Sequence, residues 1–187
     1  MEPDRSGLVR RKDRGDLKAT RAQQLGTSCW PRLRELRLRA LAEAPTAFGP
    51  TLAREQAFTD DVWRQRAERG ASGVDNITFV ADQDGRWLGI ATGLASDSDV
   101  PDDPRPELVG MFVCPEARRH GCGAALVDAV LDWARARQAA GLCLWVTATN
   151  EPAIALYDTC GFRPTGETKP LVHSPAVALI RMVRGLP

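Results

Sequence analysis

Apolar residues in the first part of the chain recur at helical spacing. Over residues 30–45 the sequence places Leu33, Leu36 and Leu41 on one stripe. This spacing predicts an amphipathic helix that ends at the proline and carries arginines on its outer face. The glutamates between those arginines indicate a solvated face rather than a nucleic-acid surface.

A second helical region follows over residues 51–70 and carries its own start and stop signals. Thr59 or Asp60 can act as the N-cap, since both side chains accept hydrogen bonds from a first-turn N–H. Gly70 can end the helix, because glycine adopts the left-handed conformation that follows many helices.

The period then changes to that of strands. Residues 76–96 contain two apolar runs about Asp84 and Gly85, a pair that favours a tight hairpin turn with positive φ. In residues 16–23 apolar and polar residues alternate weakly, which is typical of an edge strand. Residues 107–114 form a further apolar strand after a loop rich in acids and prolines.

The last third of the chain combines helical and strand-like runs. They are a helix from about Gly121 to Ala140, a strand from Leu142, a helix from about Glu151 to Thr159 that ends at Gly161, and strands near residues 162–167 and 176–183. Helices therefore interleave with strands that form a mixed, largely antiparallel set. The predicted class is α+β, a central sheet flanked by helices, or α/β with a mixed sheet.

Length and composition indicate one globular domain. The chain has 187 residues, of which 43% are hydrophobic and 26% charged, with a formal net charge of +1. This balance gives no general attraction to nucleic acid or to an anionic membrane. Residues 1–15 are charged and lack apolar periodicity, which indicates a disordered tail before a single domain over 16–187.

No apolar run approaches the roughly 18 residues that span a bilayer, and no signal-peptide core is present, so we expect a cytoplasmic protein.

Cysteine and histidine usage argues against a disulfide framework and against a metal site. The five cysteines include no CxxC pair, and the two histidines, His120 and His173, are far apart. Cys160 has no histidine close in sequence that could activate a thiolate. We therefore expect no metal and no cysteine nucleophile.

Two glycines, Gly121 and Gly123, stand where the long helix is predicted to begin. Inside a helix each would cost about 1 kcal/mol relative to alanine. The absence of Cβ lets an anion reach the unpaired N–H groups at the positive end of the helix dipole. A phosphate cradle is therefore one interpretation, and tight packing of helix on strand is the other.

Two sequence blocks carry a more specific pattern. In residues 107–130, Arg118, Gly121 and Gly123 match the spacing Arg or Gln, two residues, Gly, one residue, then Gly or Ala. The second block contributes Asn150, Ala153, Tyr157 and the pair Gly161-Phe162. Together they resemble the GNAT superfamily of acetyl-CoA-dependent N-acetyltransferases, over about residues 107–165. One departure is Arg119, where the family commonly has glycine.

The resemblance implies a GNAT-like fold in which acetyl-CoA lies between the fourth and fifth strands. The pantetheine arm would bond to the strand backbone, with the Val113 N–H near the thioester carbonyl. The pyrophosphate would lie on the N–H groups from Arg118 through Ala124. The implied cofactor-binding residues are Met111, Phe112, Val113, Arg118, Arg119, His120, Gly121, Cys122, Gly123, Ala124, Asn150, Ala153 and Tyr157.

Two residues are candidates for proton transfer. Glu107 begins the fourth strand, and its offset from Arg118 resembles that of a general-base glutamate in the family; a solvated strand-end carboxylate is the alternative. Tyr157 is the single tyrosine and shares a helical stripe with Asn150 and Ala153, which suits a general acid as well as a packing residue. Asn150 also fits an N-cap.

The implied reaction is direct transfer of acetyl from acetyl-CoA to a primary amine in a ternary complex, by a monomer or homodimer without nucleic-acid or membrane partners. Residues 97–107 carry five acids and one arginine, which would favour a cationic acceptor. Phe48, Trp63 and His173 could face that acceptor or serve as core and loop residues. Two rival hypotheses are a non-catalytic acyl-CoA-binding or regulatory module of the same fold and a nucleotide-binding protein.

Overall fold

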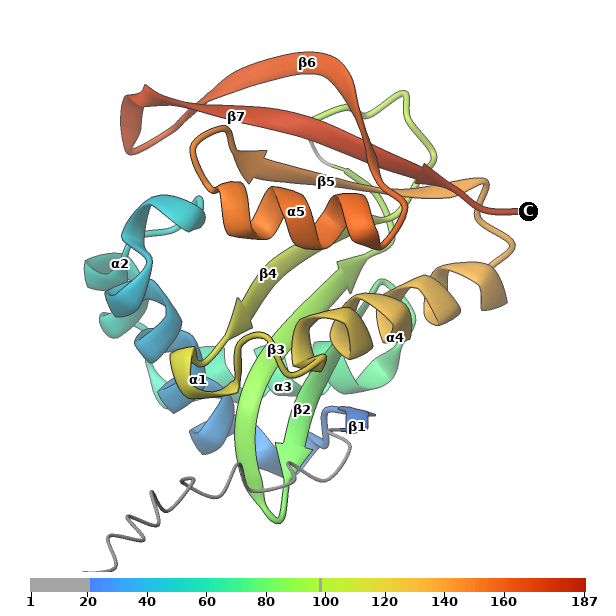
Figure 1. Ribbon diagram of the computed structural model, residues 1–187. Helices are drawn as coiled ribbons and strands as arrows, with labels where there is room; N and C mark the ends of the chain where they lie inside the picture. Colours follow the sequence, from blue (N-terminus) through green and yellow to red (C-terminus); the bar gives the residue numbers. More distant parts are fainter. Residues whose placement is uncertain (1–20, 98) are drawn as a thin grey trace, which may run out of the picture.

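One seven-stranded sheet organises the computed structural model, which describes residues 21–97 and 99–187 (Figure 1). The strands are β1 Arg21–Gln24, β2 Asn76–Gln83, β3 Arg86–Leu94, β4 Glu107–Val113, β5 Gly141–Thr147, β6 Arg163–Leu171 and β7 Ser174–Gly185, and they lie in the order β1-β2-β3-β4-β5-β7-β6. Within these strands β4 and β5 pair in parallel and the other neighbours are antiparallel. The α+β class and the largely antiparallel sheet are therefore confirmed. The predicted tail, residues 1–15, lies outside the described residues.

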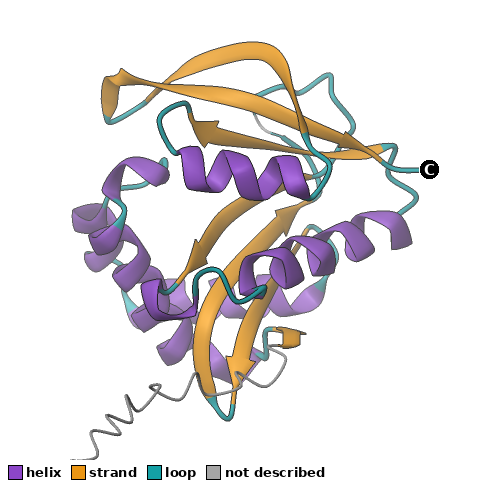
Figure 2. Cartoon of the chain, viewed as in Figure 1, coloured by secondary structure: helices purple, strands orange, loops and turns teal. Residues whose placement is uncertain are grey.

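Helices cover both faces of the sheet (Figure 2). They are α1 Trp30–Glu43, α2 Leu52–Gln56, α3 Asp60–Ser72, α4 Cys122–Ala136 and α5 Glu151–Thr159, with single 3-10 turns η1 Thr27–Cys29, η2 Pro45–Ala47 and η3 Pro115–Ala117. Alternate strand residues enter two different cores, because successive side chains point to opposite faces. Val80 packs with α1 and α3, whereas Ala81 packs with α4. None of these helices is long and apolar enough to cross a membrane.

The sheet opens between β4 and β5. Their register contains two pairs, Glu107 with Cys143 and Leu108 with Leu144, after which β4 continues beside β3 alone. Gly110 has a φ of 64°, and the β3–β4 register shifts at this point. Such a bulge bends the strand that carries the extra residue. Figure 1 shows β4 running away from β5 beyond the paired residues.

Several predicted elements are confirmed by the observed bounds. The first predicted helix corresponds to α1, and the predicted hairpin to β2 and β3, with Asp84 at a φ of 51° and Gly85 at 83° in its turn. The predicted edge strand is β1 in its described part, and it does lie at the edge of the sheet. Both final strands are longer than predicted.

Two predicted helix ends are wrong, and backbone geometry explains both. α3 continues through Gly70 to Ser72, and Gly73, with a φ of 70°, ends it. α4 ends at Ala136 rather than near Ala140, because Gln138 is left-handed with a φ of 57°. The Ala139 N–H then bonds to the Ala134 carbonyl, as in a Schellman motif.

Gly70 has a packing role instead of a terminating one. A Cβ at this position would lie 2.6 Å from Thr78 Oγ1 on β2, so glycine lets α3 approach the sheet closely. Thr78 Oγ1 is itself held by a 2.9 Å hydrogen bond to Thr92 Oγ1. The neighbour therefore has little freedom to move away.

We predict that Gly70→Ala destabilises the protein even though alanine is the better helix former. The propensity gain of about 1 kcal/mol is opposed by an overpacking cost of about 1–3 kcal/mol. The measurement is the urea midpoint of unfolding. Gly185→Ala is the matched control, because a Cβ on Gly185 would meet no atom within 4 Å. Equal midpoints for the two variants would contradict the packing explanation.

Candidate functional site

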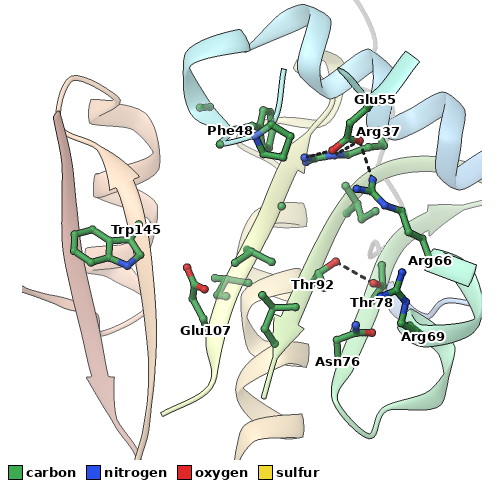
Figure 3. Close-up of a pocket in the computed structure, with 18 of the residues that line it drawn as sticks. Arg37, Phe48, Glu55, Arg66, Arg69, Asn76, Thr78, Thr92, Glu107 and Trp145 are labelled. Carbon is green, nitrogen blue, oxygen red and sulfur yellow. Dashed lines mark hydrogen bonds and ion pairs between the residues drawn. The ribbon is translucent and has the colours of Figure 1, made fainter. Parts of the chain in front are cut away.

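A cavity of about 630 Å³ lies between the α1–α3 layer and one face of β2, β3 and β4, and it extends to β5 and β6 (Figure 3). Its floor contains two rows of paired residues. In the first row Leu94 pairs with both Asn76 and Glu107. In the second, Thr92 pairs with Thr78 and with Val109. The site is therefore built on the strands next to the opening in the sheet.

Glu107 lies in this cavity, in the first of the two residue pairs that join β4 to β5. Its side chain is buried, with 8% of the residue exposed. Burial raises the pKa of Glu107 to about 7, with a further increase from the Asp97 carboxylate and opposing effects of Lys169 and Arg181. The predicted alternative, a solvated strand-end carboxylate, is therefore not what the structure contains. A carboxyl group with this pKa can exchange protons near neutral pH.

The acidic loop before β4 pairs much of its charge inside the protein. Asp97 and Asp103 are buried and both accept hydrogen bonds from Arg181 Nη2, at 3.2 and 2.6 Å. Asp99 forms an ion pair with Lys169. Because these carboxylates are paired, the loop attracts a cationic acceptor less than its composition suggests.

A second cluster of buried charge lies at the opposite side of the cavity. Glu55 is fully buried and accepts two hydrogen bonds from Arg37, both 3.1 Å, and one from Arg66, 3.0 Å. These guanidinium groups hold the pKa of Glu55 below its usual value despite burial. Sequence reasoning missed this cluster. The one feature of the sequence that could have indicated it is Arg37, a charged residue four positions after Leu33 on the otherwise apolar stripe of α1.

Residues 47–50 form one part of the cavity wall. Thr147 Oγ1 at the end of β5 donates to the Thr46 carbonyl at 2.7 Å, and His173 Nε2 lies 2.9 Å from the Phe48 carbonyl. Phe48 and Trp63 line the cavity, whereas His173 is an exposed residue of the β6–β7 turn. The turn therefore contacts the cavity wall through the backbone of this segment.

The open edge of β4 faces the gap left by β5. The Cys114 N–H donates to the Leu88 carbonyl of β3. Because the backbone groups of successive residues in a strand point to opposite sides, the N–H and C=O groups of Val113 point away from β3, toward the gap. Arg118 Nε donates to the Val113 carbonyl at 2.9 Å, which leaves the Val113 N–H on the gap side. Phe112 pairs with β3, and its side chain is buried beneath α1. The structure does not bring Phe112 to the gap.

The loop from β4 to α4 presents unpaired backbone donors. Arg119 has a φ of 64° and Gly121 a φ of 81°. Within the described residues no acceptor is found for the N–H groups of residues 119–124, the last three of which belong to the first turn of α4. The left-handed Arg119 gives a physical reason for the glycine common at this position in similar sequences. Successive N–H groups in such a turn form an anion-binding concavity.

The two signature glycines have different surroundings. A Cβ on Gly121 would meet nothing within 4 Å, so its positive φ is the reason for glycine there. A Cβ on Gly123 would lie 2.9 Å from Leu156 of α5. Gly121 thus fits the interpretation of open donors, whereas Gly123 allows close packing against the helix α5 rather than against a strand.

The helix α5 places its predicted residues on the other face of the sheet. Asn150 is the N-cap, as predicted, and its side chain accepts from the Ala153 N–H at 3.3 Å. Tyr157 is buried, its ring stacks edge-on against Phe162, and burial raises its pKa. The hydroxyl therefore stays protonated at neutral pH and can act only as a donor of its proton.

The four buried cysteines, Cys114, Cys122, Cys143 and Cys160, offer no reactive thiolate. Burial raises the pKa of Cys122 to about 11 and that of Cys143 to about 12, and it raises the pKa of Cys114 and Cys160 as well. The Cys122 thiol in the first turn of α4 is buried, so only its backbone N–H faces the loop concavity. These thiols remain protonated at neutral pH.

Curated relatives match part of the chain. Human N-acetyltransferase 8 is 33% identical over 101 residues, which cover 54% of this chain and 44% of that protein. The alanine N-acetyltransferase of ribosomal protein bS18 from Escherichia coli K12 is 31% identical over 101 residues, which cover 54% of this chain and 64% of that enzyme. The chain therefore spans less than two thirds of the length of these relatives.

The fold is shared with solved structures. The structure of yncA from Salmonella typhimurium with its cofactor acetyl-CoA has a TM-score of 0.74 and 18% identity, and the match covers 91% of this chain and 95% of that one. The model of the Acetyltransferase (GNAT) family matches residues 30–162, which is more than half of the chain. This protein therefore belongs to the acetyltransferase (GNAT) family.

Proposed function

We propose that the protein transfers an acetyl group from acetyl-CoA to a primary amine by direct attack within a ternary complex. The observation that carries this proposal is Glu107, a buried carboxyl group with a pKa of about 7 at the point where β4 leaves β5. The E. coli relative, whose name states that it acetylates an alanine of a ribosomal protein, supports an amine acceptor.

The residues around the opening suit acetyl-CoA. The loop over residues 119–124 offers unpaired N–H groups for a pyrophosphate, and the gap side of β4 offers Val113 and Met111 to an extended pantetheine arm. When bound, acetyl-CoA supplies the acetyl group as a thioester. Asn150 and Ala153 would line the other side of the gap from α5.

The proposed proton transfers use residues on both sides of the opening. An aliphatic amine has a pKa of about 10.4, so it must lose a proton before it can attack. Glu107 accepts that proton, directly or through water, from the cavity side. The Val113 N–H donates a hydrogen bond to the carbonyl oxygen as it gains negative charge. As the C–S bond breaks, Tyr157 donates a proton to the departing sulfur from the α5 side, and the second proton that the amide nitrogen releases returns through solvent to the tyrosine.

Direct attack is favoured over an acetylated enzyme by the state of the thiols. Cys122 is the cysteine nearest the loop concavity, and its pKa of about 11 keeps it protonated and poorly nucleophilic. Cys143 pairs opposite Glu107 in the sheet, but its pKa of about 12 has the same consequence.

We predict that Glu107→Gln slows acetylation by a factor that depends on pH. A general base contributes about 100-fold to 10,000-fold to the rate. Because Glu107 ionises near pH 7, the ratio of wild-type to variant kcat/KM should be small at pH 5.5 and rise until about pH 8. Thiol release with a panel of amines measures this ratio.

The ratio separates the contribution of Glu107 from the ionisation of the amine, which affects both proteins equally. Glu68→Gln on the exposed surface of α3 is the matched control and should leave the rate unchanged at every pH. A ratio that is constant from pH 5.5 to 8.5 would indicate a carboxylate with an ordinary pKa and would contradict the assignment.

Glu107→Gln should also stabilise the fold, and more so at pH 8 than at pH 5. The folded-state pKa lies above the ordinary value of 4.5, so the folded protein holds this proton more tightly than the unfolded chain. Wild-type stability therefore falls as pH rises from about 4.5 through 7, by an amount on the order of 3 kcal/mol. Urea midpoints of both proteins at the two pH values measure the difference. The same midpoint difference at both values would show that Glu107 is not desolvated.

Tyr157→Phe should lower kcat without weakening coenzyme A binding. The substitution keeps the ring that packs on Phe162 and removes only the hydroxyl group. Loss of a general acid predicts a decrease of roughly 100-fold. Steady-state kinetics and calorimetric titration with coenzyme A distinguish the two quantities, and a variant with wild-type kcat would assign Tyr157 to packing alone.

A further inference from the structure

We infer that the acceptor is a small amine that also carries an anionic group, and that Arg69 together with Arg66 binds this group. The inference names the substrate class of the proposed acetyl transfer and rests on that function. It comes from the distribution of charge and of unpaired donors in the 630 Å³ cavity. A carboxylate and a phosphonate present the same chemistry to guanidinium groups.

The α3 side of the cavity has more positive charge than its own carboxylate can balance. Glu55 is shared by two guanidinium groups, those of Arg37 and Arg66. Its two oxygens already accept three hydrogen bonds, and Arg66 uses only Nη1 in this contact. One carboxylate therefore faces two cations, both of which line the cavity.

Arg69 adds a third cation on the same side. Its one hydrogen bond within the described residues runs from Nε to the Gln65 carbonyl at 3.3 Å, one turn back on α3. Arg69 is an exposed residue at the edge of the cavity, and its terminal nitrogens have no acceptor in the described part of the chain. Figure 3 shows the guanidinium groups of Arg66 and Arg69 on the side of the cavity away from Trp145. A planar anion is the ligand that such paired donors bind best.

The opposite end of the cavity suits the amine. Glu107 begins the row that Leu94 and Asn76 continue, so its backbone lies about 10 Å from that of Asn76 across two strand spacings. Lys169 on this side is already paired with Asp99. The cavity is thus negative where the proposed base lies and positive beneath α3. An acceptor with an amine at one end and an anion at the other matches both.

The size of the cavity favours a small molecule over a protein chain. Its volume falls within the range of about 300–1,000 Å³ that small-molecule sites occupy. The 45–50 segment, held by Thr147 and His173, contributes part of the wall. An internal peptide backbone also brings no anion to Arg69. We therefore infer that the acceptor is a free amine that carries an acidic group.

The test compares acidic amines with their neutral amides. The panel contains glycine, 4-aminobutyrate, 6-aminohexanoate, the standard L-amino acids and 2-aminoethylphosphonate, each carboxylate paired with its amide. Spermidine and a short peptide represent the other amine classes. With acetyl-CoA present, mass spectrometry detects the acetyl adduct and thiol release measures kcat/KM. We expect at least one acid to exceed its own amide by roughly tenfold or more.

Variants then assign this preference to α3. Arg69→Gln should raise KM for the preferred acid about tenfold or more, with little change in kcat, and should leave the weak acetylation of the amide unaltered. Arg64→Gln is the matched control on the same helix, since Arg64 pairs with Asp61 and stacks on Trp30 outside the cavity. It should match the wild type on both substrates.

The outcomes separate this inference from the proposed function. Equal rates on acid and amide, or acetylation confined to spermidine or the peptide, would overturn the acidic acceptor and leave acetyl transfer standing. An acid preference that survives Arg69→Gln would overturn the role of Arg69. Absence of any acetyl adduct across all classes, with coenzyme A still raising the melting temperature, would reject the transferase proposal itself.

Discussion

The separation of β4 from β5 is the constraint on which the site depends. Two residue pairs hold these parallel strands together, and the bulge at Gly110 then directs β4 along β3. A strand that loses one neighbour exposes N–H and C=O groups that must find other partners. The Val113 N–H is one of these groups. The opening therefore creates a hydrogen-bonding edge inside the sheet, on the strand that begins with Glu107.

The surrounding charges differ in how completely they are paired. Arg181, Asp97 and Asp103 form a buried network in which the carboxylates are satisfied, so it stabilises the loop before β4. Glu107 and Trp63, by contrast, are buried in the cavity wall without comparable partners. Local violations of polar pairing concentrate at functional sites.

The sequence allowed much of the fold to be predicted because apolar periodicity is a local property. The stripe of α1 and the Asp84-Gly85 turn are examples. Helix ends were harder, since a glycine serves equally as a terminator or as a close-packing residue. Gly70 is the second kind, and only its distance to Thr78 on a strand shows it. Gln138 ended α4 without any glycine at all.

The candidate site was predictable where one segment contains the pattern and not where distant segments meet. Arg119 and Gly121 lie in one loop, so their donors could be anticipated from the motif. The Arg37, Glu55 and Arg66 cluster joins three helices, and no local spacing relates its members. The most direct test of the central claim is hydrogen exchange of the whole protein with and without acetyl-CoA. We predict new protection at residues 111–113 and 119–124, with little change in β2; protection confined to other segments would contradict the assignment of the opening as the coenzyme site.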